Sequence, residues 1–121
     1  MARILIIDDD PQILNMLGQT LEREGHEVID ASDGKEGLRL YRENLTDLII
    51  TDLIMPEKEG IETIMELRRD FPDVKIISIS GGGRIDAEQY LSMAQKLGAQ
   101  RTFAKPVARA ELLKAVRELL G

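Results

Sequence analysis

Five short runs of aliphatic and β-branched residues alternate along the chain with longer segments whose apolar residues have a helical spacing. Runs of this kind predict buried strands, and apolar residues three and four positions apart predict amphipathic helices. The predicted strands are Ile4–Ile7, Val28–Ile29, Leu48–Thr51, Ile76–Ile79 and Thr102–Ala104. Strands that alternate with helices pair in parallel and are covered on both faces of the sheet, so this pattern leaves few folds.

Five helices are expected, one after each strand. Their apolar faces contain Leu17, Leu38, Ile64, Leu91 and Val116, and residues typical of helix ends stand at Gly25, Asn44, Pro72, Gly98 and Gly121. The chain has 121 residues with no repeat or linker. We therefore predict one domain over residues 1–121, with an α/β fold built on a doubly wound, mainly parallel sheet.

The composition argues against several classes of protein. No stretch approaches the roughly 18 apolar residues of a membrane span, and the apolar run near the N-terminus is shorter than that of a signal peptide. The net charge of −6 and the aromatic content of 3% argue against direct binding of nucleic acid. The sequence has no cysteine, which excludes disulfides and thiolate metal sites, and we expect a cytoplasmic protein without membrane contact.

Polar residues stand at the carboxyl ends of the predicted strands. Asp8, Asp9 and Asp10 follow the first strand, Asp52 the third, Ser80 the fourth and Lys105 the fifth. A parallel sheet brings these strand ends to one edge, where the binding crevice of such folds lies, so we expect the groups to converge. Each also has an ordinary interpretation. Asp10 before Pro11 is typical of a helix N-cap, and the others could be solvated or turn residues.

The chemistry of these groups fits phosphoryl transfer. Clustered carboxylates favour a hard cation, and Mg²⁺ suits a small set of ligands because it retains several waters. The metal would offset the repulsion among the aspartates and leave one carboxylate able to attack phosphorus. Lys105 could neutralise a phosphoryl group, and the Ser80 hydroxyl could donate to one of its oxygens. The glycines at 81–83 match neither common phosphate-loop motif.

Four motifs, "ILIIDDDP", "LIITDLIMPEKEG", "IISIS" and "FAKP", follow one another in strand order along the whole chain. In this pattern the sequence resembles the receiver domain of two-component response regulators. The resemblance implies a flavodoxin-like fold with five helices and a parallel sheet in the strand order 2-1-3-4-5. It also implies a signalling domain rather than an enzyme, which catalyses only its own phosphorylation and dephosphorylation.

The resemblance assigns the acidic residues to phosphorylation and metal binding. Asp52 is expected to be the phosphoacceptor. Asp8 and Asp9, with Asp52, are expected to hold Mg²⁺, or Mn²⁺ in its place, and Asp9 is the expected direct ligand of the acidic pair. The backbone carbonyl of Ile54 is expected to be a further ligand.

The resemblance also assigns the switch. Ser80 and Lys105 are expected to contact the phosphoryl group, and Ser80 and Phe103 to change position with phosphorylation. Phe103 is expected to turn into the space that Ser80 vacates, and the peptide bond before Pro106 to be cis. A histidine kinase or phosphotransfer protein is the implied donor. The surface of the fourth helix, fifth strand and fifth helix is expected to act on an unknown downstream protein or output domain.

Two positions depart from the usual pattern of the family. Phe103 lacks the hydroxyl of the more common tyrosine, so it cannot offer that hydrogen bond to a partner. Ile54 is apolar where many relatives have a polar residue, and it cannot orient the water that hydrolyses an aspartyl phosphate. Slow loss of the phosphoryl group is therefore expected.

Two other interpretations stay open. Asp8-x-Asp10 also resembles the opening motif of haloacid-dehalogenase-type phosphatases, which use an aspartyl nucleophile with Mg²⁺. However, Gln12 stands where those enzymes have threonine or valine, and the chain is short for that fold. Phosphorylation of Asp8 would indicate that class, and phosphorylation of Asp52 the receiver. The second alternative is a pseudo-receiver that binds partners without phosphorylation, although the complete set of acidic, hydroxyl and lysine groups argues against it.

Overall fold

The computed structural model describes residues 2–52, 60–80, 92, 95–96 and 98–121. These residues form β1 (Arg3–Ile7), α1 (Pro11–Arg23), β2 (Glu27–Ala31), α2 (Gly34–Glu43), β3 (Leu48–Asp52), α3 (Gly60–Asp70), β4 (Ile76–Ser80), β5 (Arg101–Ala104) and α5 (Arg109–Leu120). The predicted fourth helix, around Ala87–Ala94, lies almost wholly outside the described residues. Ser92, Gln95 and Lys96, which are described, are helical. No helix in the described ranges has the length and apolar character needed to cross a membrane.

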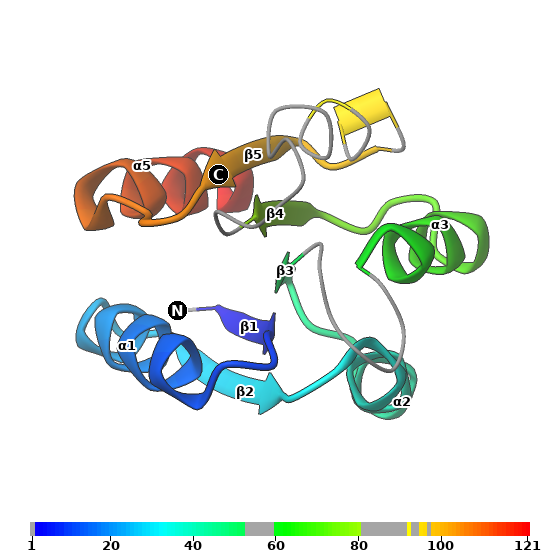
Figure 1. The fold of residues 1–121 in the computed structure, drawn as a ribbon, viewed down its shortest axis with the longest axis horizontal. Helices are drawn as coiled ribbons and strands as arrows, with labels where there is room; N and C mark the ends of the chain where they lie inside the picture. Colours follow the sequence, from blue (N-terminus) through cyan, green and yellow to red (C-terminus); the bar gives the residue numbers. More distant parts are fainter. Residues whose placement is uncertain (1, 53–59, 81–91, 93–94, 97) are drawn as a thin grey trace.

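The five strands form one sheet in the order β2-β1-β3-β4-β5, and every neighbouring pair is parallel. Helices α1 and α5 cover one face, and α2 and α3 cover the other (Figure 1). The predicted α/β fold and strand order are therefore confirmed. Strands β3 and β4 are buried along their whole length, because helices cover both of their faces.

Alternate residues of each strand divide the core into two clusters. On the side of α1 and α5, Ile6 and Ile50 pack with Leu17 and Leu112. The cluster on the side of α2 and α3 contains Leu5, Ile7, Leu38, Ile49, Ile64 and Ile76. The face of any strand residue therefore follows from its position along the strand, which determines where the polar residues near the strand ends point.

Aspartate side chains cap the N-termini of two helices. The Asp10 carboxylate accepts a hydrogen bond from the Gln12 N–H at 2.9 Å, and Pro11 occupies the first turn of α1. The Asp33 carboxylate accepts from the Glu36 N–H at 2.8 Å and caps α2 in the same way. These caps satisfy N–H groups that a helix start leaves unpaired. The N-cap interpretation of Asp10 is thus confirmed.

Candidate functional site

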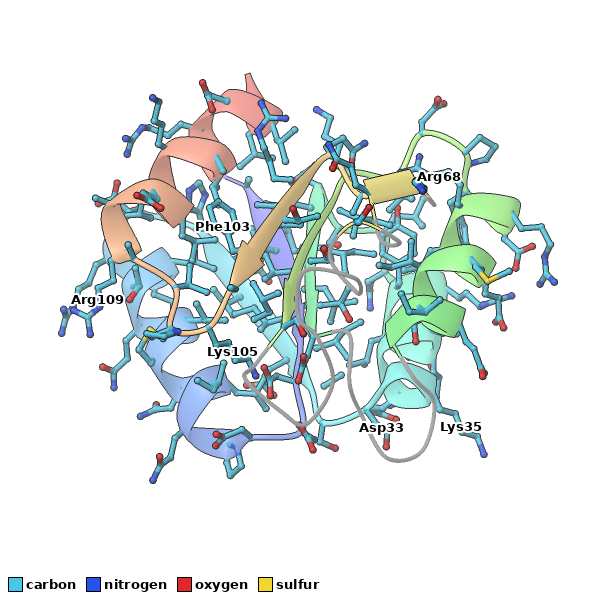
Figure 2. The ribbon with its side chains drawn as sticks, turned by 45° about the horizontal axis from the view of Figure 1, so that its top comes forward. Asp33, Lys35, Arg68, Phe103, Lys105 and Arg109 are labelled. Carbon is cyan, nitrogen blue, oxygen red and sulfur yellow. The ribbon has the colours of Figure 1, made fainter. Side chains whose placement is uncertain are left out.

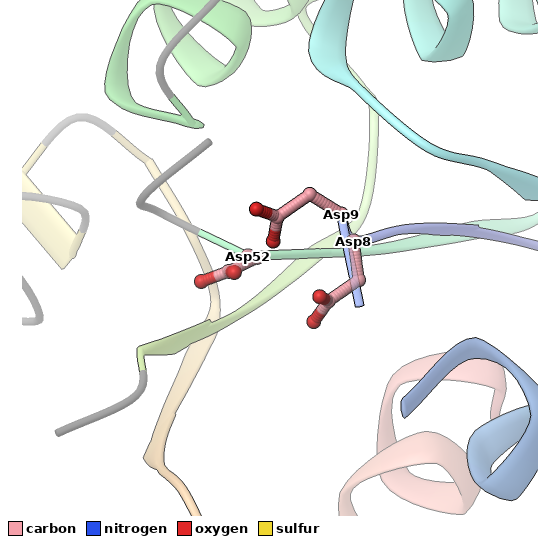
Figure 3. Close-up of side chains that lie close together, drawn as sticks. All are labelled: Asp8, Asp9 and Asp52. Carbon is pink, nitrogen blue, oxygen red and sulfur yellow. The ribbon is translucent and has the colours of Figure 1, made fainter. Parts of the chain in front are cut away.

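Asp8, Asp9 and Asp52 converge just beyond the carboxyl ends of β1 and β3 (Figure 3). One carboxylate oxygen from each residue lies within 4.8 Å of the other two. Asp8 and Asp52 are buried, and Asp9 is exposed. Three oxygen donors in this arrangement, without nitrogen or sulfur, suit a hard divalent cation such as Mg²⁺. The fourth expected ligand, the carbonyl of Ile54, lies outside the described residues.

The Asp8 side chain is held by its own strand end. Its Oδ1 accepts a hydrogen bond from the Asp10 N–H at 2.9 Å, and its backbone N–H donates to the Ala31 carbonyl of β2 at 3.1 Å. Burial raises the pKa of the Asp8 carboxyl, because the charged form has lost its water, while the Asp10 N–H and Lys105 oppose this rise. A cation close to Asp8 therefore stabilises the charged form of its carboxyl group.

Lys105, just after β5, places its positively charged ammonium group beside two of these carboxylates. Its Nζ lies 2.9 Å from Asp8 Oδ2 and 3.3 Å from Asp52 Oδ2, so one ammonium group bridges two carboxylates. Burial acts to lower the pKa of Lys105, but its hydrogen bonds and charge interactions with Asp8 and Asp52 outweigh burial and raise it. The Lys105 side chain is therefore positively charged at neutral pH. The Lys105–Pro106 peptide bond is cis, as expected from the sequence.

Ser80 ends β4 beside this cluster. Its side chain is fully buried, and its Oγ has no hydrogen-bond partner among the described residues. The Ser80 carbonyl accepts a hydrogen bond from the Lys105 backbone N–H at 2.8 Å, which joins the ends of β4 and β5. The hydroxyl is thus a donor without an acceptor among the described residues, one position beyond the β4 residue that pairs with Asp52.

Phe103 lies on the other face of the sheet from Ser80. In the register of β4 and β5, Phe103 stands opposite Ile79, and Ala104 stands opposite Ser80. Phe103 packs against the core on the side of α1 and α5 (Figure 2). Successive strand residues point to opposite faces, so Phe103 cannot turn into space beside Ser80 while β5 keeps its register. The register contradicts the expected movement of Phe103.

Thr102 is the β5 residue that sequence reasoning missed. It stands opposite Ser78, which shares its face with Ser80 two positions later. The alternation along "TFAKP" was the available signal: Lys105 has to reach Asp8 and Asp52, so residues 103 and 105 share one face and Thr102 has the other. Thr102 and Ala104 are therefore the β5 residues on the face that Ser80 shares, and Thr102 is the one with a polar side chain.

Comparison with known proteins connects this site to one family. The family model described as "Response regulator receiver domain" matches residues 4–117. Protein PilH of Pseudomonas aeruginosa is 32% identical over 121 residues, which is all of this chain and 99% of PilH. Transcriptional regulatory protein GlrR of Escherichia coli is 35% identical over 120 residues, but the chain spans only 26% of its length.

Solved structures have the same fold. A response regulator receiver domain protein from Clostridium thermocellum superposes with a TM-score of 0.91 at 34% identity, covering 99% of this chain and 94% of that one. Response regulator TrrA from Thermotoga maritima, solved in complex with Mg²⁺ and BeF, gives 0.87 at 31% identity and covers 98% and 99% of the two chains.

Proposed function

Since the chain belongs to the response regulator receiver family, we propose that it accepts a phosphoryl group on Asp52 from a phosphohistidine donor and changes conformation as a result. The observation that carries this proposal is the meeting of three carboxylates and one ammonium group at a single edge of the sheet. Asp8 and Asp9 follow β1, Asp52 ends β3 and Lys105 follows β5, so the sheet order itself assembles them.

In the proposed reaction, an Asp52 carboxylate oxygen attacks phosphorus and the P–N bond of the donor histidine breaks. The bonding electrons stay with the imidazole, which takes up a proton from water, and the product is an aspartyl phosphate. Mg²⁺ bound by the three aspartates would supply charge neutralisation at the phosphoryl oxygens. Lys105 would move part of its interaction from Asp52 to a phosphoryl oxygen, and the Ser80 hydroxyl would donate to another.

The geometry of Asp8 disfavours the haloacid-dehalogenase alternative, in which that residue is the nucleophile. Asp8 is fully buried, with one oxygen hydrogen-bonded to the Asp10 N–H and the other 2.9 Å from Lys105 Nζ. Asp10, the second acid of that motif, caps α1. Both oxygens of Asp8 are therefore already engaged, and the Asp10 side chain is used as a helix cap.

The test is direct labelling. The protein is incubated with acetyl phosphate and Mg²⁺, the acyl phosphate is trapped by borohydride reduction, and the modified residue is located by mass spectrometry. We expect label on Asp52 and none in Asp52→Asn, with Asp73→Asn, an exposed carboxylate in the loop before β4, labelled like the parent. Label on Asp8 would indicate the phosphatase class, and no label on any residue would indicate a pseudo-receiver.

The partners follow from the same proposal. A histidine kinase or phosphotransfer protein is the donor, and the receiver acts on a downstream protein or on an output domain of its own chain. We propose that β5, α5 and the segment between β4 and β5 form the surface that changes. Both arrangements have similar relatives: the chain covers 99% of the length of PilH, but only 50% of the length of regulator CpxR of Escherichia coli.

A further inference from the structure

A row of hydroxyl side chains crosses the sheet one layer below the phosphorylation site. Thr51 of β3 stands opposite Ser78 of β4, and Ser78 stands opposite Thr102 of β5. All three lie on the face that α2 and α3 cover, because Ile76 of β4 packs in that core and Ser78 follows it by two positions. Ser80 lies on the same face one step nearer the site.

The members of this row differ in their hydrogen bonding. The Thr51 hydroxyl donates to the Asp52 carbonyl at 3.0 Å. The Ser78 side chain is fully buried, yet its Oγ has no partner in the part of the chain that the structure describes. Buried hydroxyls are nearly always hydrogen-bonded, so one without a partner calls for an explanation. Two such hydroxyls, Ser78 and Ser80, occur two residues apart on one strand.

The backbone offers a route from Ser80 to β5. The Lys105 N–H donates to the Ser80 carbonyl at 2.8 Å, so a movement of the end of β4 is passed to the end of β5. Thr102 lies three residues before Lys105 and is only partly buried, which leaves its side chain room to change rotamer. A shift of β5 along β4 would change the separation of Ser78 and Thr102, the directly opposed pair.

We propose that Ser78 is a positioning residue of the switch, whose hydroxyl has no partner among the described residues of the resting protein and bonds the Thr102 hydroxyl when Ser80 is drawn to a phosphoryl group. The inference rests on the proposed function of Asp52. A ligand shifts a conformational equilibrium only through interactions that differ between the two states. A hydrogen bond present in one state alone is such a difference, and it favours the phosphorylated form without stabilising the resting one.

The test measures binding of beryllofluoride with Mg²⁺, which imitates the phosphoryl group, by calorimetry on the whole chain. Ser78→Ala and Thr102→Val should each weaken binding by roughly two- to tenfold, the range expected for one net hydrogen bond. The double variant should be no weaker than either single variant, because both changes remove the same bond. Thr102→Ser, which keeps the hydroxyl, should bind like the parent.

Two controls separate this role from a structural one. In the absence of beryllofluoride, Ser78→Ala should not lower the unfolding midpoint, since its hydroxyl has no bond to lose within the described part of the chain. Thr20→Val in α1, which removes a buried hydroxyl bonded to the Met16 carbonyl at 2.8 Å, should lower that midpoint but leave beryllofluoride affinity unchanged. Unchanged affinity in Ser78→Ala, or additive losses in the double variant, would overturn the inference alone. Failure of the folded parent to bind beryllofluoride would overturn the proposed function as well.

Discussion

Lys105 contributes one ammonium group to two buried carboxylates, and this sharing determines the charge balance of the site. Its Nζ is closer to Asp8 than to Asp52, at 2.9 Å against 3.3 Å. Metal and lysine therefore act on the same two acids. The lysine neutralises part of their negative charge in the metal-free protein, and a bound metal ion would neutralise part of it as well.

Replacing Lys105 by methionine should leave Asp8 and Asp52 without a counter-charge. Breaking a buried ion pair costs about 3–5 kcal/mol, and the 19% exposure of the lysine side chain reduces our expectation to about 1–3 kcal/mol. Urea unfolding in EDTA at neutral pH measures this loss. Mg²⁺ should restore more stability to Lys105→Met than it adds to the parent, while Lys75→Met, an exposed lysine, should match the parent. Equal Mg²⁺ effects in all three proteins would contradict the account.

Asp8 should limit stability when no metal is bound. Burial raises its pKa above the ordinary 3.8, so the folded protein binds the carboxyl proton of Asp8 more tightly than the unfolded chain does. The resulting stabilisation is complete below the unfolded pKa and is lost as the pH rises through the raised pKa. Asp8→Asn should therefore melt higher than the parent at neutral pH in EDTA, and the difference should shrink on acidification toward pH 3.8. A variant that melts lower at neutral pH would show that the charged form is favoured.

At the scale of elements, two contacts hold the helices of one face close to the sheet. A Cβ atom at Gly37 would overlap the Ile7 side chain, so α2 packs against β1 at glycine distance. Arg68 of α3 donates to the carbonyls of Pro72 and Gly98, both at 2.6 Å, and so links α3 to the turn before β4 and to the segment before β5. These contacts set the position of α2 and α3 over the sheet.

Two glycine-to-alanine substitutions should have opposite effects. Alanine favours a helix over glycine by about 1 kcal/mol, which should dominate at Gly18, where a Cβ would meet only Val28 at 3.9 Å. At Gly37 the overlap with Ile7 should outweigh this gain and destabilise the fold by about 1–3 kcal/mol. Chemical denaturation of both variants gives the comparison. A stabilised Gly37→Ala would mean that Ile7 moves aside freely.

At the scale of the whole molecule, the strand order places the site. The chain adds β2 on one side of β1 and β3 on the other, and a doubly wound sheet has its crevice where the order reverses. Asp8 follows β1 and Asp52 ends β3, the two strands at that point. The repulsion between their carboxylates is thus a property of the fold, and a cation bound there should stabilise the folded chain as a unit.

Mg²⁺ should accordingly raise the melting temperature. At a hundredfold excess over its dissociation constant, a ligand bound only by the folded state adds about 2.7 kcal/mol, or roughly 8–15 °C for a domain of this size. Differential scanning calorimetry with Mg²⁺ and with Mn²⁺ measures the rise for each metal. Asp9→Ala should lose most of it, because Asp9 is the exposed member of the cluster and the expected direct ligand of its acidic pair. The same rise in Asp9→Ala would place the metal elsewhere.

The sequence by itself determined the alternation of strands and helices and the meeting of Asp8, Asp9 and Asp52 at one edge, while the strand order came only from the resemblance to the receiver family. The alternation and the meeting of the aspartates depend on local patterns, since apolar periodicity defines each element and parallel pairing brings all carboxyl ends together. The capping role of Asp10 was likewise readable, because an N-cap interacts only with the next few residues of its own helix.

Only the tertiary structure decided how these elements fit against one another. The faces of Thr102 and Phe103 depend on the pairing of β5 with β4, where a slip of one residue reverses every side chain. Groups far apart in the sequence likewise determine the sharing of Lys105 between two acids, the lack of a partner for the Ser78 hydroxyl among the described residues, and the close approach at Gly37. Burial, pairing and packing are sums over such distant neighbours, and a pattern of residue types along one chain does not contain those distances.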